Sequence, residues 1–459
     1  MRKNAVWQDS KPVTSDDVEF TLQEAKDPLI KSYKRPGFEG VTVEKVDDKT
    51  IVFKLKQPYT PFLENTTLGI LPKHIWGNIS SESFSNTKYN LEPIGSGPYM
   101  INNIVTTKTS DSTYGISVLP QYYDLAPFKY FALGEAKIET VRIRFYPNED
   151  ELLSAYRSGE IEAINTIPPQ IAKSLKDQGA KVIEVTLPRI FAVFFNQNHS
   201  KAVADKAVRG ALNAVTNKTD IVNEILLGFG TQISGPVPNS SVSPTTASTS
   251  DAVRIANAQK ILTTGGWKFN TKKNIWEKTV KKVKTTLAID ISTADTPELK
   301  NAAEIIKKNW EQLGVQVNLN VFEIGDLNQN VIRPRKYDAL FFGEIIGRNP
   351  DLFSFWHSSQ RNDPGINISM YTNSKADKLL GAARVELDPN KKAKIYSDLQ
   401  KELDNDTPAI FIYSPSFLYA PPSKIKNLVM GSITIPSDRF LSIYKWYIDT
   451  EKVWKIFAN

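Results

Sequence analysis

The sequence predicts an α/β protein with a largely parallel sheet, and two observations support this prediction. Apolar strand-like segments alternate with helix-like segments across residues 285–342, and Thr296–Leu313 repeats apolar residues at three- and four-residue steps. Alternating strands and helices are typical of parallel sheets, whose ligands bind beyond the carboxyl ends of the strands. We therefore expect a binding site where the strand Asp338–Phe342 enters the aromatic and polar loop Gly343–Trp356.

The N-terminal region predicts a helix followed by a hairpin. Thr14 precedes the predicted helix Ser15–Ala25 as an N-cap, and Asp17 supplies a carboxylate in its first turn. The segment Val41–Leu55 alternates apolar and polar residues on both sides of a turn, which predicts a hairpin with one buried face. The first residues, Met1–Val6, have the pattern of a strand interior.

The next region predicts short elements around a buried strand. Asn148–Arg157 has the capping pattern of a helix, which is expected to run into a strand at Ile161–Ile164. Phe191–Asn196 predicts a strand that ends in asparagine, either at a cleft or as plain core with a turn. Two helices, Val203–Val215 and Thr219–Leu227, follow it.

The second half of the chain predicts a surface loop, a hairpin and a helix pair. Pro236–Ser250 is rich in Ser, Thr and Pro, which indicates a surface loop or a linker. Thr271–Lys284 carries six lysines among apolar residues and favours a solvated hairpin over a nucleic-acid-binding segment. Further on, the residue pattern predicts the helices Lys375–Leu387 and Asn390–Leu403, the strand Pro408–Tyr413, and a terminal strand and helix that include Trp446, Trp454 and Phe457.

Composition limits the classes of function. The chain has 459 residues, 41% of them hydrophobic, so it can bury a large core in two or three domains. Its net charge of +7 arises from 57 basic and 50 acidic residues, a well-mixed surface without a nucleic-acid footprint. No long uncharged apolar run predicts a membrane span.

Residues for catalysis or metal binding are sparse. The chain lacks cysteine, and its three histidines lie far apart without an HExxH pattern, so we predict no metal site and no cofactor. Ser358, Ser359 and His357 are sequence neighbours without nucleophile-elbow glycines. We therefore predict no catalytic residues and no enzyme.

A set of short motifs resembles one protein family in order along the whole chain. Trp7–Val18 resembles the W-x-DG-x-PVTA-x-DV signature of the extracytoplasmic solute-binding proteins of ABC importers, family 5, the oligopeptide, dipeptide and nickel group. Nine motifs occur in register. The others are Ile70–His74, Pro93–Tyr99, Ala155–Glu162, Ala207–Val215, Gly265–Trp267, Leu313–Val315, Tyr337–Asp338 and Asn349–Asp351.

The resemblance implies a periplasmic-binding-protein-like fold (type II, cluster C) with two lobes, a hinge and an extra inserted domain. Mapped here, residues 1–92 form most of the inserted domain, 93–197 with 436–459 form the first lobe, and 198–435 form the second. Pro93–Tyr99 is then a segment crossing between domains, although a tight turn explains its glycines and prolines equally well. Family members carry roughly a hundred residues before the tryptophan signature, with an export signal and the first strands, so we expect this chain to lack them and to expose sheet edges.

The implied function is capture of a short peptide or related solute between the lobes and its delivery to a membrane permease with its ATPase. The resemblance places such a protein outside the cytoplasm, in the periplasm or on the outer face of the membrane, as a monomer that is soluble or lipid-anchored. The alternatives are a protein of the same fold that binds an oligosaccharide or a metal chelate, and a fragment without function.

The predicted binding site centres on the segment Phe342–Ile345. A peptide ligand satisfies its backbone groups by adding to an exposed strand edge, and Gly343 is expected to allow its close approach. The predicted ligand-binding residues are Phe195, Asn196, Phe342, Gly343, Glu344, Ile345, Arg348 and Trp356. Family peptide binders hold the ligand amine with an aspartate where this chain has Ile346, so Glu344, Asp351 and Asp363 are candidate substitutes.

Overall fold

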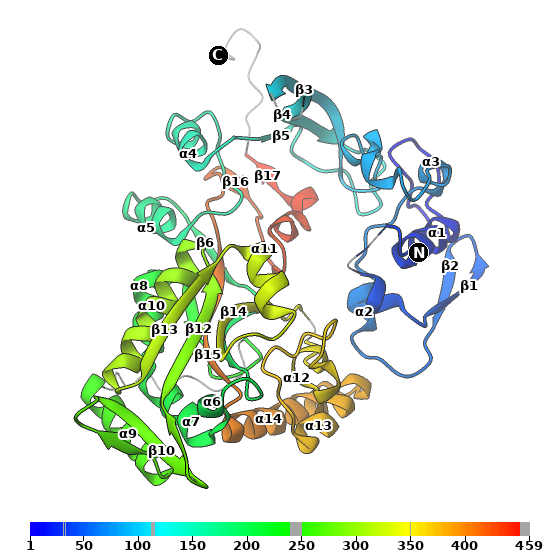
Figure 1. Ribbon diagram of the computed structural model, residues 1–459. Helices are drawn as coiled ribbons and strands as arrows, with labels where there is room; N and C mark the ends of the chain where they lie inside the picture. The colour runs from blue at the N-terminus through cyan, green and yellow to red at the C-terminus, as the bar shows by residue number, and fades with distance from the viewer. Residues whose placement is uncertain (31, 33, 112–114, 239–249, 349, 450–459) are drawn as a thin grey trace.

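The computed structural model describes residues 1–30, 32, 34–111, 115–238, 250–348 and 350–449. Figure 1 shows the N-terminal residues around α1, β1 and β2 on one side, the strands β3–β5 at the top, and a large sheet covered by helices below. The N-terminal part comprises α1 (Ser15–Lys26), β1 (Thr42–Asp47), β2 (Thr50–Lys54), α2 (Phe62–Asn65) and α3 (Lys73–Trp76).

Asp17 organises the start of the N-terminal part. Its buried carboxylate accepts hydrogen bonds from the Thr14 amide at 2.8 Å, the Trp7 indole at 3.2 Å and the Lys73 amide at 2.8 Å. The predicted helix and the hairpin β1–β2 are confirmed. The strand expected at Met1–Val6 is absent, since Val6 makes only an isolated bridge with Pro12, and this stretch turns back on itself.

A three-stranded antiparallel sheet follows, and the sequence analysis missed most of it. It consists of β3 (Tyr99–Asp111), β4 (Gly115–Pro127) and β5 (Val141–Arg144), in this order. The register of β3 shifts between Ile101 and Asn103 and again after Val105. These irregularities break the strict alternation of apolar and polar residues by which a strand is recognised.

The main sheet has the strand order β13-β12-β14-β7-β15-β6, with β8 beside β15. Its strands are β6 (Ile183–Thr186), β7 (Arg189–Phe195), β8 (Gly230–Gln232), β12 (Ala288–Ala294), β13 (Gln316–Phe322), β14 (Ala339–Ile345) and β15 (Ala409–Tyr419). Only β13, β12 and β14 are parallel to one another. The other pairings are antiparallel, so the prediction of a largely parallel sheet was wrong outside the βαβ segment from which it was made.

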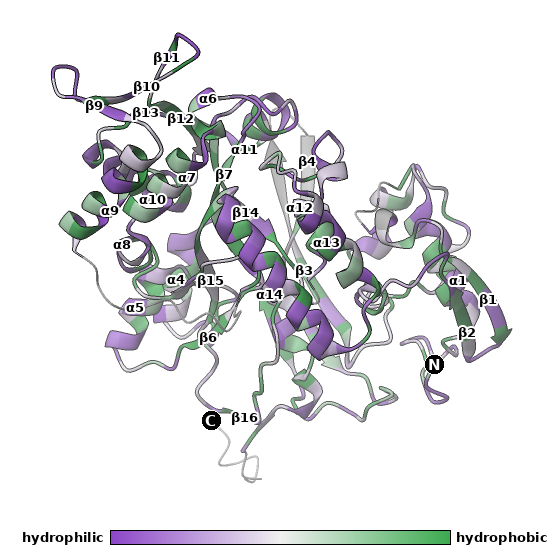
Figure 2. Cartoon of the chain, turned by 90° about the horizontal axis from the view of Figure 1, so that it is seen from below, coloured by the Kyte–Doolittle hydropathy of each residue, from purple (hydrophilic) through white to green (hydrophobic). Residues whose placement is uncertain are grey.

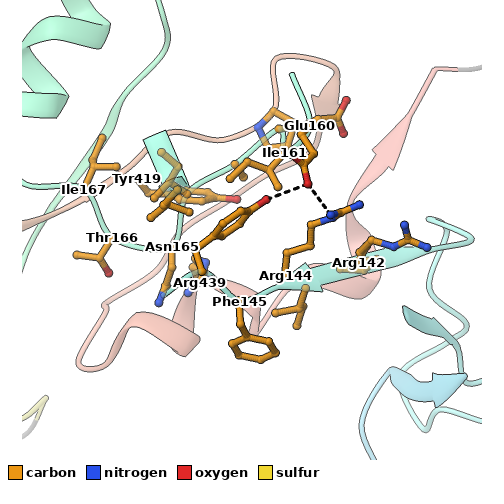
Figure 3. Close-up of a pocket in the computed structure, with 18 of the residues that line it drawn as sticks. Arg142, Arg144, Phe145, Glu160, Ile161, Asn165, Thr166, Ile167, Tyr419 and Arg439 are labelled. Atoms are coloured by element: carbon orange, nitrogen blue, oxygen red, sulfur yellow. Dashed lines mark hydrogen bonds and ion pairs between the residues drawn. The ribbon is translucent and has the colours of Figure 1, made fainter. Parts of the chain in front are cut away.

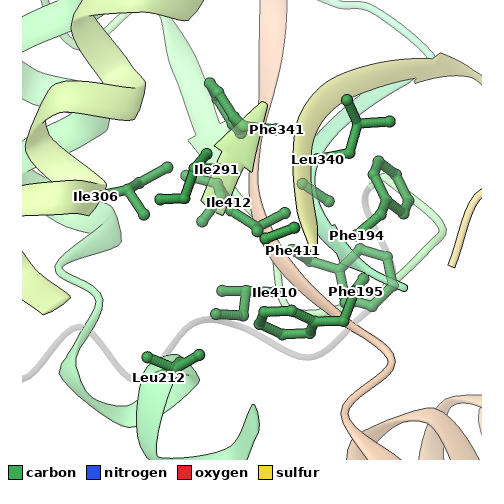
Figure 4. Packing of buried hydrophobic residues seen from close by; sticks show 14 of the residues in the cluster. Phe194, Phe195, Leu212, Ile291, Ile306, Leu340, Phe341, Ile410, Phe411 and Ile412 are labelled. Carbon is green, nitrogen blue, oxygen red and sulfur yellow. The ribbon is translucent and has the colours of Figure 1, made fainter. Parts of the chain in front are cut away.

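Helices cover both faces of the main sheet. On one face lie α6 (Lys201–Ala204), α7 (Lys206–Val215), α8 (Lys218–Ile225) and α10 (Pro297–Gln312), and on the other lie α12 (Phe353–Trp356), α13 (Ser374–Val385) and α14 (Pro389–Asp406). Two neighbouring residues of β7 show this arrangement, because Phe195 stacks on Trp310 of α10 whereas Phe194 packs against Trp356 of α12. Figure 4 shows the aromatic and aliphatic side chains that fill the core around these strands.

Buried Arg209 joins the two helical layers at the edge of this core. It lies on α7, within the motif Ala207–Val215, and is 4% exposed. Its guanidinium donates to the carbonyl oxygens of Val203 and Ala204 at 2.8 and 2.9 Å and to those of Asp406 and Thr407 at the end of α14 at 2.7 and 3.0 Å. The motif arginine is therefore a structural residue.

The remaining helices and strands lie between these elements and near the C-terminus. They are α4 (Glu149–Arg157), α5 (Pro169–Asp177), α9 (Asp251–Thr264), β9 (Lys268–Asn270), β10 (Ile275–Val280), β11 (Val283–Thr286), α11 (Ile324–Asp326) with a π-helical turn at Leu327–Ile332, β16 (Ile425–Lys426) and β17 (Tyr447–Ile448). In Figure 2 the hydrophilic residues of α13 and α14 are turned towards the viewer, as in amphipathic surface helices. None of the described helices combines the length and the apolar character that crossing a bilayer requires.

Most of the helices and strands predicted from local sequence patterns are present in the structure. The helices α4, α7, α8, α10, α13 and α14 and the lysine-rich hairpin β10–β11 are confirmed. The strand predicted at Ile161–Ile164 was wrong, because only Ile164 bridges, to Ala420. Most of the loop Pro236–Ser250, together with Trp454 and Phe457, lies outside the described residues, whereas Trp446 is buried as expected.

Two adjacent strands connect the main sheet to the rest of the molecule. The Leu187 amide donates to the Pro415 carbonyl at 3.0 Å, and the Ser414 hydroxyl donates to the Leu187 carbonyl at 2.8 Å, so the chain crosses twice at this point. β7 lies centrally in the main sheet, whereas β15 beyond Pro415 pairs with β6. The domain boundaries predicted at residues 197 and 435 stay predictions.

Candidate ligand-binding site

The carboxyl end of β14 presents an open strand edge. β7 pairs with β14 along its whole length, from Ala339 to Ile345. On the other side β12 pairs only with Ala339 and Leu340, and the Thr293 hydroxyl donates to the Phe341 carbonyl at 2.9 Å. Beyond Phe341, no strand among the described residues covers this edge.

The alternation of hydrogen bonds shows which backbone groups face the open edge. Ile346 donates to Pro188 at 2.8 Å, and Asn196 donates to the Asp338 carbonyl at 2.9 Å, so the even-numbered residues of β14 bond to β7. In an antiparallel pair the intervening residues point their N–H and C=O groups away from that partner. The backbone groups of Gly343 and Ile345 therefore face the open edge.

Gly343 has a packing role that differs from the one expected. A β-carbon on this residue would lie 2.7 Å from the nearest ring atom of Phe191, directly opposite on β7. The Phe191 ring itself stacks on Tyr413 with the ring centroids 4.9 Å apart. Glycine is required here because an aromatic ring fills the space above it, and the expectation that Gly343 also allows a ligand backbone to approach stays a prediction.

Glu344 points into the core on the opposite face. Neither of its carboxylate oxygens has a hydrogen-bond partner among the described residues. Burial raises the pKa of the Glu344 carboxyl well above its ordinary value and so favours its neutral form. A neutral buried acid does not form an ion pair with the amine of a ligand.

The structure divides the other predicted site residues into two groups. Phe195 and Trp356 are fully buried between the sheet and its helices and offer no surface to a ligand. Asn196 is buried too, and its side-chain amide donates to the Arg335 carbonyl at 2.8 Å. These three residues support the strand ends, whereas Phe342 is half-buried and the Ile345 side chain is exposed at the edge.

Arg348 connects the loop after β14 to the C-terminal segment. It pairs with Asp438 at 2.8 Å and donates to the Ser432 carbonyl at 3.1 Å. Asp438 in turn accepts from the Thr434 amide at 2.8 Å. Arg348 therefore holds the start of the loop after β14 against the C-terminal segment. This contact could not be predicted from the sequence.

Of the candidates for an amine clamp, Asp351 is committed elsewhere, whereas Asp363 makes only a long contact at the surface. Ile346, at the position of the family aspartate, is buried and apolar. Asp351 forms a bidentate pair with Arg384 at 3.0 and 2.7 Å, and Asp363 lies 3.9 Å from Arg333. The edge of β14 can therefore recognise a backbone, but no free carboxylate of this set stands beside it.

A cavity lies between β5, the segment after α4 and the C-terminal segment. It has a volume of about 860 Å³, and none of the eight predicted site residues lines it. Figure 3 shows Arg144 beside Glu160, which it contacts at 2.5 Å, with Tyr419 and Arg439 further along the wall. β5 borders this cavity, and in the described chain it pairs only with β4. The wall of this cavity combines a strand edge with apolar and charged side chains.

Arg439 was missed by the sequence analysis although it is a half-buried charge in the wall of the cavity. Its guanidinium lies 4.0 Å from the Phe440 ring centroid and 5.5 Å from that of Tyr419. Burial lowers the pKa of Arg439, whereas the neighbouring Tyr419 acts in the opposite direction. A single arginine in an irregular segment gives no periodic signal from which this position could have been found.

The described residues contain no group of three or more His, Asp or Glu side chains that could hold a metal ion. The candidate site therefore consists of backbone groups on an open edge, a half-buried aromatic residue and a loop held by ion pairs. Such an arrangement is typical of a protein that binds a solute between two lobes.

Comparisons with known proteins agree with this class. Residues 1–367 match the model of the bacterial extracellular solute-binding proteins, family 5. The oligopeptide-binding protein AppA of Bacillus subtilis is 27% identical over 463 residues, which cover 98% of this chain and 80% of the relative. The chain therefore belongs to the bacterial extracellular solute-binding proteins of family 5 and is the solute-binding component of an ABC importer.

Solved structures show the same fold over nearly the whole chain. A putative peptide-binding protein AppA from Clostridium difficile superimposes with a TM-score of 0.80 at 20% identity, covering 97% of this chain and 87% of that one. NikZ from Campylobacter jejuni, in complex with Ni(L-His), superimposes with a TM-score of 0.72 at 23% identity, covering 97% and 86%. The fold is thus the cluster C periplasmic-binding-protein fold.

Proposed function

We propose that this protein captures short peptides by pairing their backbone with the open edge of β14 and delivers them to a membrane permease with its ATPase. The observation that carries the proposal is the outward direction of the Gly343 and Ile345 backbone groups on an edge with no strand partner in the described chain. Four hydrogen-bonding groups on alternate residues match the spacing of an added strand.

The two strand crossings supply the hinge in this proposal. One lobe contains the main sheet and its helices, and the other contains β3–β5 with the C-terminal segment. The crossings lie side by side near Leu187 and Pro415, and both are close to the end of β14, because Ile346 bonds to Pro188. Ligand bound at this edge would favour the closed arrangement of the lobes, which is the shape presented to the membrane partner.

The selectivity proposed for this site follows from its chemistry. Backbone pairing accepts peptides of many side-chain sequences. In this proposal no carboxylate holds the ligand amine, so binding does not depend on that amine. Relatives named for oligopeptides and for a nickel chelate share this fold, and a chelate brings its own metal ligands. We favour peptides because a strand edge satisfies a peptide backbone, whereas a compact chelate leaves edge groups unpaired.

The test is native mass spectrometry of the purified protein after incubation with a mixture of unblocked peptides of two to nine residues. We expect peptides to be retained without cleavage, and calorimetry with a retained peptide should give saturable binding. Parallel incubation with nickel and L-histidine is the comparison. Retention of the nickel complex with no peptide retained would overturn the peptide proposal.

A further inference from the structure

The N-terminal part touches both lobes. Gln8 holds it to the segment before β3, since its amide donates to the Gly95 carbonyl at 2.9 Å and its side chain donates to the Tyr99 carbonyl at 2.7 Å. On the other side the Tyr59 hydroxyl donates to the Asp351 carboxylate at 2.9 Å. These two residues are 292 positions apart in the sequence, so the contact spans separate parts of the molecule.

Asp351 is the centre of this second contact. Arg384, in the last turn of α13, binds its carboxylate through Nε and Nη2 at 3.0 and 2.7 Å. The Phe353 amide donates to the same group at 3.3 Å. A carboxylate that accepts from a guanidinium, a phenol and an amide has a fixed orientation.

Arg384 is held from both sides. Its guanidinium lies 3.8 Å from the centroid of the Phe353 ring and 5.5 Å from that of Tyr59. The Thr60 amide donates to the Arg384 carbonyl at 2.8 Å. The arginine therefore contacts the N-terminal part through its backbone and through the face of Tyr59, and contacts the binding loop through its charge.

The contact between Asp351, Arg384 and Tyr59 is largely shielded from solvent. The side chains of Asp351 and Arg384 are 17% and 28% exposed. Burial, and then the charge of Asp351, raises the pKa of Tyr59, so the phenol remains a donor. A charge-assisted hydrogen bond in such surroundings is stronger than an exposed one.

Asp351 also lies close in sequence to the proposed ligand edge. It follows Ile345 by six residues, on the loop that leaves β14 and leads into α12. The neighbouring Pro350 carbonyl accepts a hydrogen bond from the Tyr396 hydroxyl of α14. The loop after the edge is therefore fastened at one end by Arg348 to the C-terminal segment and at the other end by Asp351 to the N-terminal part.

We propose that Tyr59 and Arg384 are positioning residues for ligand binding, which act through Asp351 to hold the segment 350–353 and the N-terminal part together. This inference rests on the proposed function for its effect on affinity, but the fastening itself does not require a ligand.

The first test measures the fastening without ligand. The chain has no cysteine, so spin labels on cysteines placed at Leu63 and Leu387, which are 76% and 81% exposed, report one distance between the N-terminal part and α13. We expect Tyr59→Phe to lengthen and broaden this distance with an unchanged thermal melt. Tyr130→Phe, at an exposed tyrosine, is the matched control and should change nothing. An unchanged distance in Tyr59→Phe would overturn the inference.

The second test separates positioning from simple attachment. With the peptide mixture as probe, Tyr59→Phe is expected to weaken retention about tenfold, the effect of losing one charge-assisted hydrogen bond. Asp351→Asn should show a similar loss, and the double variant should lose no more than either single one, because both act through one contact. A changed distance with unchanged peptide retention would overturn the positioning role. A wild-type protein that retains no peptide but shows the distance change would refute the proposed function and leave the fastening intact.

Discussion

Replacement of Ile345 by proline tests the open edge directly. The Ile345 N–H faces away from β7, since Ile345 and Arg189 form a pair without mutual hydrogen bonds, so proline removes no bond of the sheet. It removes one donor to the ligand and places a ring where the ligand strand would lie. Loss of one backbone hydrogen bond to a desolvated partner costs about 1–3 kcal/mol, which is roughly a 5- to 150-fold loss of affinity.

The assay is titration calorimetry with a retained peptide, with Ile345→Ala as the matched control. Alanine keeps the N–H and removes only an exposed side chain, so its affinity should stay within about threefold of the wild type. Both variants should melt near the wild-type temperature. If Ile345→Pro binds as tightly as Ile345→Ala, the ligand does not pair with β14, and the cavity bordered by β5 becomes the place to examine.

Four further outcomes are expected. Glu344→Gln should melt at a higher temperature than the wild type at pH 8. The raised pKa of the Glu344 carboxyl in the folded protein stabilises the wild type fully below the ordinary value of 4.5, and this contribution is lost as the pH rises, whereas the glutamine variant has no such contribution. Melting temperatures that fall equally with pH in both proteins would contradict this. Gly343→Val should lower the free energy of unfolding in urea by about 1–3 kcal/mol, because its side chain clashes with Phe191. Gly381→Ala is the control and should not lower it, because no atom stands where its β-carbon would lie. Equal stabilities of the two variants would show that Phe191 does not require glycine at position 343. Arg209→Met should cost about 3 kcal/mol because it leaves buried carbonyl groups unpaired, and a loss below about 1 kcal/mol would show that water replaces the guanidinium. Acetylating the amine of a retained peptide should change its affinity less than about threefold by calorimetry, and a large loss would reveal a clamp outside the candidates.

The sequence was informative where short-range periodicity determines structure. The apolar spacing of α10 and the left-handed Gly314 that follows it, with φ at 89°, could be read locally. The family motifs gave the fold because many short patterns occurred in order. Strand direction was not available in this way, since β7 and β15 find their antiparallel neighbours through contacts far apart in sequence.

The site was only partly predictable for the same reason. The strand predicted to end at Phe342 continues to Ile345, and nothing in the sequence reveals that Phe191 fills the space above Gly343. Phe195 and Trp356 have the composition of a pocket wall, and only the packing of helices on both faces shows that they are core. Asp351 resembled a free carboxylate because its partner Tyr59 lies in another part of the chain.

The alternating direction of the β14 backbone has a consequence for hydrogen exchange. The amides of Phe342, Glu344 and Ile346 face β7, so their protons should exchange slowly whether or not ligand is present. The amides of Gly343 and Ile345 face the open edge and should exchange quickly in the free protein and slowly in the complex. Protected and unprotected amides would then alternate along one strand, and protection of the Gly343 and Ile345 amides on binding would show that the ligand occupies the open edge of β14.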